Sequence, residues 1–317
     1  MRARAYGVLF VAQLAIGSAA LLARAGLAAG LSAPALSAWR LAVAAALLAL
    51  VPAARAGAPP LPLRTRGRLV LAGCCLAAHF ASWFASLGRI PVARSTLLVT
   101  TSPLFSGLAG RFLLGARLGG RFWAGLAVGL AGAVIVMGGP SSLGGGESAG
   151  DALALTGAAL MAAYLLLVED LQPALGTRRV VGWTTASAAL AIALPVAWRE
   201  GAGALPASAA AWRSIVGMAL IPQLVGHTAL NWSLHHFPAG VVGAATLLEP
   251  VFAAALAWWL LGETLTGAQV AGAAVLLAGV GLALTGAPSP APSPGLTKVD
   301  QTAGPGAGSA RPPPSGV

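Results

Sequence analysis

Long apolar runs recur along most of the chain, separated by short segments rich in Arg, Gly and Pro, and they restrict its fold more than any other feature. A helix rises about 1.5 Å per residue, so a run of about 20 apolar residues crosses the hydrocarbon core of a bilayer. We therefore expect an all-α polytopic membrane protein with about ten transmembrane helices. The expected spans are 6–24, 34–53, 68–88, 92–114, 121–139, 151–170, 180–197, 212–234, 238–261 and 267–286.

Composition agrees with a membrane setting. Hydrophobic residues make up 57% of the 317 residues and charged residues only 9%, whereas a soluble domain carries about 25% charge. The formal net charge of +11 is compatible with a nucleic-acid partner in principle. The arginines lie between the apolar runs rather than in a basic domain, which favours loop charge in a membrane protein. We expect a lipid bilayer around the chain and no nucleic acid.

The loop charges predict an orientation. If the N-terminus lies inside, thirteen of the nineteen basic residues fall on the cytoplasmic side. Cytoplasmic loops are enriched in Lys and Arg, so we expect both termini in the cytoplasm and the protein in the inner or plasma membrane. An even number of spans agrees with that placement. Residues 287–317 are rich in Pro, Gly and Ser, which predicts a disordered cytoplasmic tail.

An internal repeat divides the part of the chain before this tail into two units. A shift of 147 residues aligns Pro91 with Pro238 and Pro103 with Pro250, and residues 91–139 give sixteen gapless identities with the second copy. The predicted units are residues 1–145 and 146–286. Five spans per unit is an odd number, so the two copies must have opposite orientations in the membrane. Inverted repeats are typical of secondary transporters, whose substrate sites lie near the midplane between the repeats.

One carboxylate lies in the middle of an apolar span. Glu249 interrupts the run 241–261 and Pro250 follows it. An ionisable group at that depth costs at least about 2.5 kcal/mol and normally faces a cavity or a partner. Pro250 and its repeat equivalent Pro103 are expected to kink their helices, and the repeat places Ser102 opposite Glu249. Glu249 is either a site for a substrate amine or a coupling proton, or a structural group bonded to neighbouring polar side chains.

Further polar residues in the apolar spans are candidates for the lining of a cavity. Gln223, His227 and Asn231 are spaced four apart, which places them on one helix face. They would either line a cavity or form hydrogen bonds between helices. His79 and Trp83 share a face by the same spacing and are expected to form a wall for an organic substrate, although Trp is also common at membrane interfaces.

Gln13 is a lone polar residue in the first span and a weaker candidate for the lining. Arg40 and Arg94 lie near the outer ends of the second and fourth spans, where they would attract an anionic group or pair with Glu249. The alternative, which we favour for Arg94, is that the side chain reaches the lipid headgroups.

Two longer segments resemble a known family. HFASWFASLGRIPVARSTLLVTTSPLFSGL, from His79, and GHTALNWSLHHFPAGVVGAATLLEPVF, from Gly226, are similar to the EamA branch of the drug/metabolite transporter superfamily. The resemblance covers about residues 6–286. It implies ten helices in two inverted repeats around a central cavity, and transport of small metabolites, amino acids or drugs, often outward, without a cofactor. Arg40 stands where that family usually has Arg, which favours a cavity or structural role.

Other classes of function find less support in the sequence. No Cys or His spacing resembles a metal site and no nucleophile has a base beside it, so we expect neither a metal, a cofactor nor an enzyme. The alternative to a secondary transporter is a non-transporting membrane partner or sensor. The substrate, the transport direction, a role for protons as coupling ion, and the oligomeric state stay open at this point.

Overall fold

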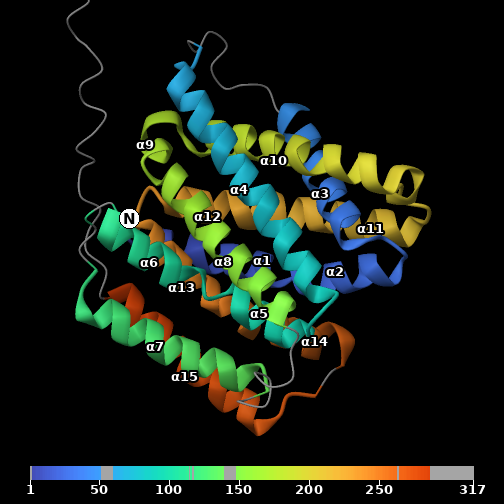
Figure 1. The fold of residues 1–317 in the computed structure, drawn as a ribbon. Helices are drawn as coiled ribbons and strands as arrows, with labels where there is room; N and C mark the ends of the chain where they lie inside the picture. Colours follow the sequence, from blue (N-terminus) through green and yellow to red (C-terminus); the bar gives the residue numbers. More distant parts are fainter. Residues whose placement is uncertain are drawn as a thin grey trace, which may run out of the picture.

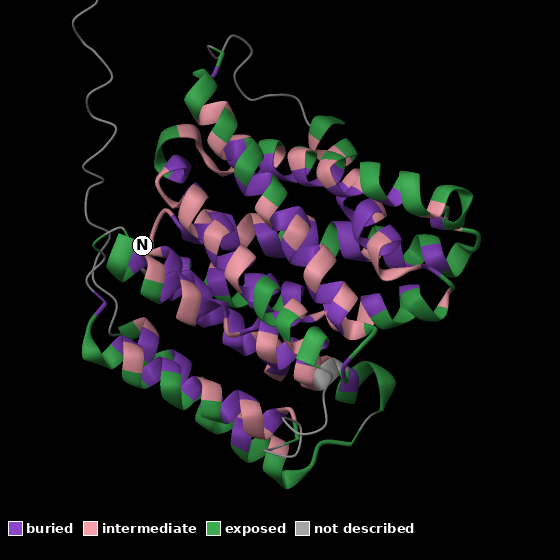
Figure 2. Ribbon diagram, in the orientation of Figure 1, coloured by how far each residue is buried: buried purple, intermediate pink, exposed green. Residues whose placement is uncertain are grey.

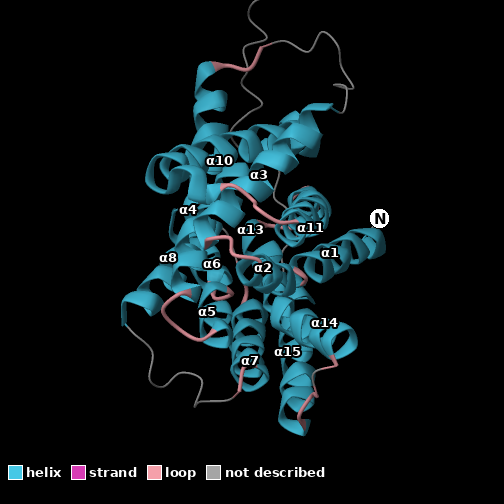
Figure 3. Ribbon diagram, turned by 90° about the vertical axis from the view of Figure 1, so that its right-hand side faces the viewer, coloured by secondary structure: helices cyan, strands magenta, loops and turns pink. Residues whose placement is uncertain are grey.

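The computed structural model describes residues 2–50, 60–113, 115, 118–138, 148–262 and 264–285, and within these ranges it contains helices and no strand (Figures 1 and 3). The predicted tail at 287–317 lies outside the described residues. The helices of the first half are α1 Arg2–Gly17, α2 Ala19–Ala28, α3 Ala33–Leu50, α4 Leu63–Leu87, α5 Val92–Val99, α6 Ser102–Leu113 and α7 Gly120–Val136.

The second half repeats this pattern with more irregular helices. It contains α8 Ser148–Glu169, α9 Leu171–Leu175, α10 Thr177–Glu200, the 3₁₀ helix η2 Gly201–Ala204, α11 Ala209–Met218, the π-helix η3 Ala219–His227, α12 Thr228–Ser233, α13 Ala239–Ala245, the 3₁₀ helix η4 Thr246–Leu248, α14 Glu249–Leu261 and α15 Gly267–Thr285.

Eight helical stretches of the described residues are long and apolar enough to cross a membrane, and α7 is a shorter apolar helix. The buried residues concentrate inside the bundle, while exposed residues cover its periphery (Figure 2). Many exposed positions carry large apolar side chains, such as Leu190, Leu194 and Trp198 on α10 and Trp259 on α14. Such a surface suits lipid rather than water, and the protein is therefore a multi-pass membrane protein.

The sequence repeat is visible in the helix boundaries. Val92 and Ala239, Ser102 and Glu249, and Gly120 and Gly267 each begin a helix, and the members of each pair are 147 residues apart. Gly115 and Gly262, at the same offset, both have φ of +68°. A left-handed residue after the last helical turn is a common helix stop that glycine adopts without strain. The fourth span and its counterpart are therefore each followed by a glycine of positive φ.

α7 and α15 form a tightly packed pair, and Figure 1 shows them side by side at the lower edge of the view. Their glycines face one another across the interface: a Cβ added at Gly125, Gly132 or Gly279 would collide with the backbone of the opposite helix. Small residues allow membrane helices to approach this closely.

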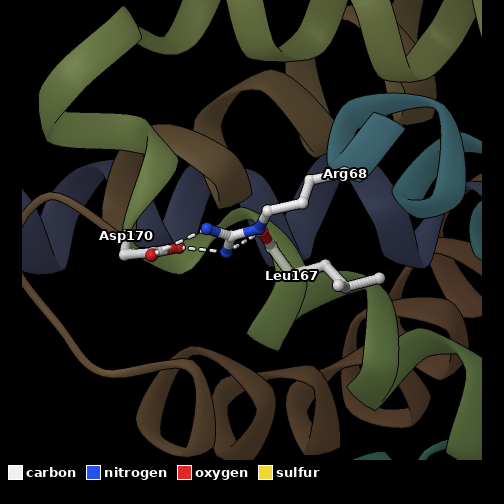
Figure 4. Close-up of polar contacts among 3 residues, drawn as sticks. All are labelled: Arg68, Leu167 and Asp170. Atoms are coloured by element: carbon white, nitrogen blue, oxygen red, sulfur yellow. Dashed lines mark hydrogen bonds and ion pairs between the residues drawn. The ribbon is translucent and has the colours of Figure 1, made fainter. Parts of the chain in front are cut away.

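Ion pairs attach both ends of α8 to the first half of the chain. Arg68, at the start of α4, forms an ion pair with Asp170, which directly follows α8 (Figure 4). The same guanidinium donates a hydrogen bond to the carbonyl of Leu167 in the last turn of α8. Arg94 of α5 pairs with Asp151, in the first turn of α8, with Nη2 to Oδ2 at 2.5 Å. Arg94 therefore has a protein carboxylate as partner, whereas the sequence had suggested lipid headgroups.

Candidate binding cavity

A cavity lies between the two halves of the bundle. The first half contributes nine lining residues and the second half five. The first nine are Ile16, Ala19, Arg40, His79, Phe80, Trp83, Val99, Thr100 and Ser102; the other five are Met161, Pro222, His227, Thr246 and Glu249. All are buried except Glu249, which is partly exposed.

Two interrupted helices border the cavity at equivalent points of the repeat. The fourth span breaks between α5 and α6 at Thr100 and Thr101, next to Pro103. The ninth changes from α13 to the 3₁₀ turn η4 and then to α14, where Pro250 occupies the first turn. Proline lacks an amide hydrogen and clashes with the preceding turn, which accounts for both interruptions. The second halves of these spans therefore begin at the cavity, with Ser102 and Glu249 as their first residues.

Arg40 is the cation of the cavity. It extends from α3, is 1% exposed, and its Nη2 donates to Gln223 Oε1 at 2.6 Å. The guanidinium lies over the ring of Phe80, with Cζ 4.0 Å from the ring centroid, which is a cation–π contact. Its Nε and Nη1 have no hydrogen-bond partner in the protein. No ion pair joins Arg40 to Glu249 or to any other carboxylate among the described residues.

The π-helix η3 positions both Gln223 and His227. Pro222 lies within it and also lines the cavity. Because π-helices form i→i+5 hydrogen bonds and are wider than α-helices, they often mark functional sites. Here Gln223 holds the Arg40 guanidinium and His227 lines the cavity, with its ring centroid 5.5 Å from that of Phe80. His227 Nδ1 is buried and has no hydrogen-bond partner in the protein.

His79 and Trp83 lie together on the cavity wall, with their rings stacked at a centroid distance of 6.1 Å. His79 Nδ1 bonds to the Gly157 carbonyl at 2.8 Å. A carbonyl only accepts, so Nδ1 carries the proton and the neutral ring keeps Nε2 as an acceptor. Trp83 is buried, and its Nε1 donor has no partner in the protein. This part of the wall thus offers one hydrogen-bond acceptor, His79 Nε2, and one hydrogen-bond donor, Trp83 Nε1.

Glu249 and Ser102 face the cavity from the two equivalent helix starts. The Glu249 carboxylate forms no hydrogen bond or ion pair with the described residues. Ser102 Oγ lies 3.5 Å from Thr246 Oγ1, which itself donates to the Gly243 carbonyl at 2.7 Å. The main chain at Glu249 packs close to Gly17 of α1, where an added Cβ would lie 3.3 Å from the Glu249 carbonyl oxygen.

Three of the predicted site residues lie outside the cavity wall. Gln223 contacts the cavity only through Arg40. Asn231 donates to the Tyr164 hydroxyl at 2.6 Å and accepts from Gln172 at 2.9 Å, so it connects helices. Gln13 is fully buried, and neither atom of its amide has a hydrogen-bond partner.

Several lining residues were not predicted from the sequence, among them Phe80, Met161, Pro222 and Thr246. Pro222 inside an apolar span was an available signal, because proline disrupts an α-helix. Thr246 is the repeat equivalent of Val99, so the repeat could have indicated it as well. Phe80 and Met161 are ordinary apolar residues in apolar helices, and nothing in the sequence distinguishes them from core residues.

A family comparison covers nearly all of the helical region. The sequence model of the EamA-like transporter family matches residues 3–138 and again 148–285. The two matches coincide with the two copies of the repeat.

Among the described residues, no group of three or more His, Cys, Asp or Glu lies close enough together to hold a metal ion.

Several curated proteins are similar in sequence. A riboflavin transporter of Rhizobium johnstonii is 40% identical over 76 residues, which are 24% of each chain. A probable amino-acid metabolite efflux pump of Salmonella typhimurium is 26% identical over 64% of this chain and 71% of its own. The pseudopaline exporter of Pseudomonas aeruginosa is 25% identical over 66% of this chain and 72% of its own. The matched segment thus spans about a quarter of the first relative and about seven tenths of the other two.

A solved structure titled "Crystal structure of protein" has the same fold. The superposition gives a TM-score of 0.72 and covers 90% of this chain and 98% of the other, with 22% identical residues. At that level of identity the likeness concerns the fold alone.

Proposed function

The chain belongs to the EamA-like transporter family, and from this premise we propose that it is a secondary transporter that exports small metabolites, amino acids or drugs across the cell membrane. The relatives named as an efflux pump and an exporter support the outward direction. Transport would proceed by alternating access, with the cavity opening first to one side of the membrane and then to the other.

One observation carries this proposal. Arg40 and Glu249 line the same cavity, come from different halves of the chain, and are not paired with each other. Charged groups within membrane spans are costly and normally mark a substrate or ion pathway. A purely structural core would pair them or replace them with apolar side chains, because unpaired buried charges lower stability.

The expected topology fits this mechanism. We propose ten spans, counting α5 with α6 and α13 with α14 as interrupted helices, in two inverted repeats of residues 1–145 and 146–286. Both termini would lie in the cytoplasm. The matching helix starts support the repeat, and the loop charges support the orientation. Interrupted spans at the midplane are the places where such transporters bind substrates and coupling ions.

Glu249 is the proposed site for a coupling proton or a substrate amine. It begins α14 at the cavity, and no described side chain bonds to it. A carboxylate that has no protein partner is free to exchange a proton or a ligand during the transport cycle. Pro103 and Pro250, beside the two interruptions, are the proposed hinges.

Untargeted profiling of the growth medium tests this function. Cells would express the unaltered protein, Glu249→Gln or neither, with matched membrane levels of the two proteins. We expect at least one compound to accumulate outside at least tenfold more with the unaltered protein than with the variant. Equal accumulation with the variant would remove Glu249 from the mechanism. Accumulation in neither case would contradict export and favour a membrane partner or sensor that does not transport.

A further inference from the structure

Arg40 is a buried cation that forms no ion pair with a carboxylate among the described residues. Its side chain lines the cavity, and only Nη2 has a protein partner, the neutral amide of Gln223. Nε and Nη1 have no acceptor. Removing a guanidinium from water without pairing it is unfavourable, and Arg is a specific ligand for carboxylates because its planar donors match their oxygens.

The surroundings of Arg40 hold the guanidinium in place and leave its Nε and Nη1 without a hydrogen-bond partner in the protein. Phe80 covers one face of the guanidinium and Gln223 fixes one nitrogen. Trp83 contributes a second unpartnered donor to the same cavity through its Nε1. The start of α6 at Ser102 also faces the cavity, and its first turn contains no acidic residue, so the positive end of this helix favours an anion there.

We propose that Arg40 binds a carboxylate of the transported substrate, so that the substrates are organic acids with an apolar or aromatic body. This inference rests on the proposed transport function and names its substrate class. A single carboxylate matches the single cation. A dianion such as a phosphate monoester would meet Glu249 in the same cavity with a surplus negative charge. Ile16, Val99 and Met161 line the remaining wall and suit an apolar body.

Two variants separate this role from a structural one. Arg40→Gln removes the cation, while Gln223→Glu keeps Arg40 and places a protein carboxylate at the atom that already lies 2.6 Å from Nη2. The new carboxylate would pair with Arg40 and compete with that of the substrate. We expect Gln223→Glu to raise the melting temperature of the purified protein and to lower the export of organic acids at least tenfold. Arg213→Gln, on the exposed face of α11, is the matched control.

The profiling experiment, repeated with these variants, tests the proposal. We expect the compounds exported by the unaltered protein and by Arg213→Gln to carry a carboxylate, and both Arg40→Gln and Gln223→Glu to lose them. Export of only neutral or cationic compounds, or unchanged export of acids by both variants, would overturn the role of Arg40 and leave transport standing. No export by the unaltered protein would count against transport itself.

A binding experiment on the purified full chain decides the point without a known substrate. Benzoate and benzamide have nearly the same shape and differ in charge. We expect benzoate to raise the melting temperature of the unaltered protein and benzamide not to, and we expect benzoate to have no effect on Arg40→Gln. Equal effects of the two probes, no effect of benzoate, or the same benzoate effect on Arg40→Gln would each overturn the proposal.

Discussion

At the scale of single residues, the central feature is a pair of opposite charges that share one cavity without touching. Arg40 has a neutral amide and an aromatic ring as neighbours, and Glu249 has no side-chain partner among the described residues. Stability alone would select against both groups, because each costs free energy at membrane depth. Their presence is best explained by ligands that bind during the transport cycle.

This interpretation predicts that replacing the Glu249 carboxylate does not lower the stability of the protein but does lower its export activity. Glu249→Gln keeps the size of the side chain and removes the carboxylate from the cavity. We expect the melting temperature of the purified variant to be unchanged or higher, while export falls at least tenfold. Glu249→Asp, which keeps the carboxylate on a shorter side chain, is the control and should retain part of the export. A clear loss of stability in Glu249→Gln would instead identify a structural carboxylate.

At the scale of elements, prolines and glycines determine the shape of the bundle. Pro103 and Pro250 accompany the two interruptions, which the sequence predicted because proline breaks the helical hydrogen-bond pattern. The π-helix η3 was not predicted. The four-residue spacing of Gln223, His227 and Asn231 suggested one continuous α-helical face, but the wider turns change which helices the side chains meet. Gln223 contacts Arg40 from within this π-helix.

The α7 and α15 pair gives a direct test at this scale. Gly279→Ala would push a methyl group into the backbone at Gly129, and overpacking of this kind costs about 1–3 kcal/mol. We expect a lower melting temperature. Gly281→Ala, on the exposed face of the same helix with nothing within 4 Å of the new methyl group, is the matched control. It should be neutral or slightly stabilising, because Ala is a better helix former than Gly. Equal effects of the two variants would mean that the helices do not pack as described.

At the scale of the whole molecule, the apolar runs and the repeat predicted an all-helical membrane protein with two copies of the family's unit. Apolar runs located the helices to within a few residues, and the 147-residue offset recurs in three pairs of helix starts. The residues that line the cavity were harder to predict from the sequence, because the neighbours of Arg40 lie on α4 and η3, far from Arg40 in the sequence. Apolar wall residues such as Phe80 and Met161 carry no pattern of their own. Only their three-dimensional positions distinguish them from the rest of the core.

The central claim is that this cavity opens alternately to the two sides of the membrane, and the accessibility of one cysteine tests it most directly. Ser102→Cys would be introduced after both native cysteines, Cys74 and Cys75, are replaced by Ala. A membrane-impermeant maleimide would then be added to intact cells and, separately, to inside-out vesicles. We predict labelling of residue 102 in both preparations, at a rate that an exported compound slows. Labelling in only one preparation, or in neither, would contradict alternating access.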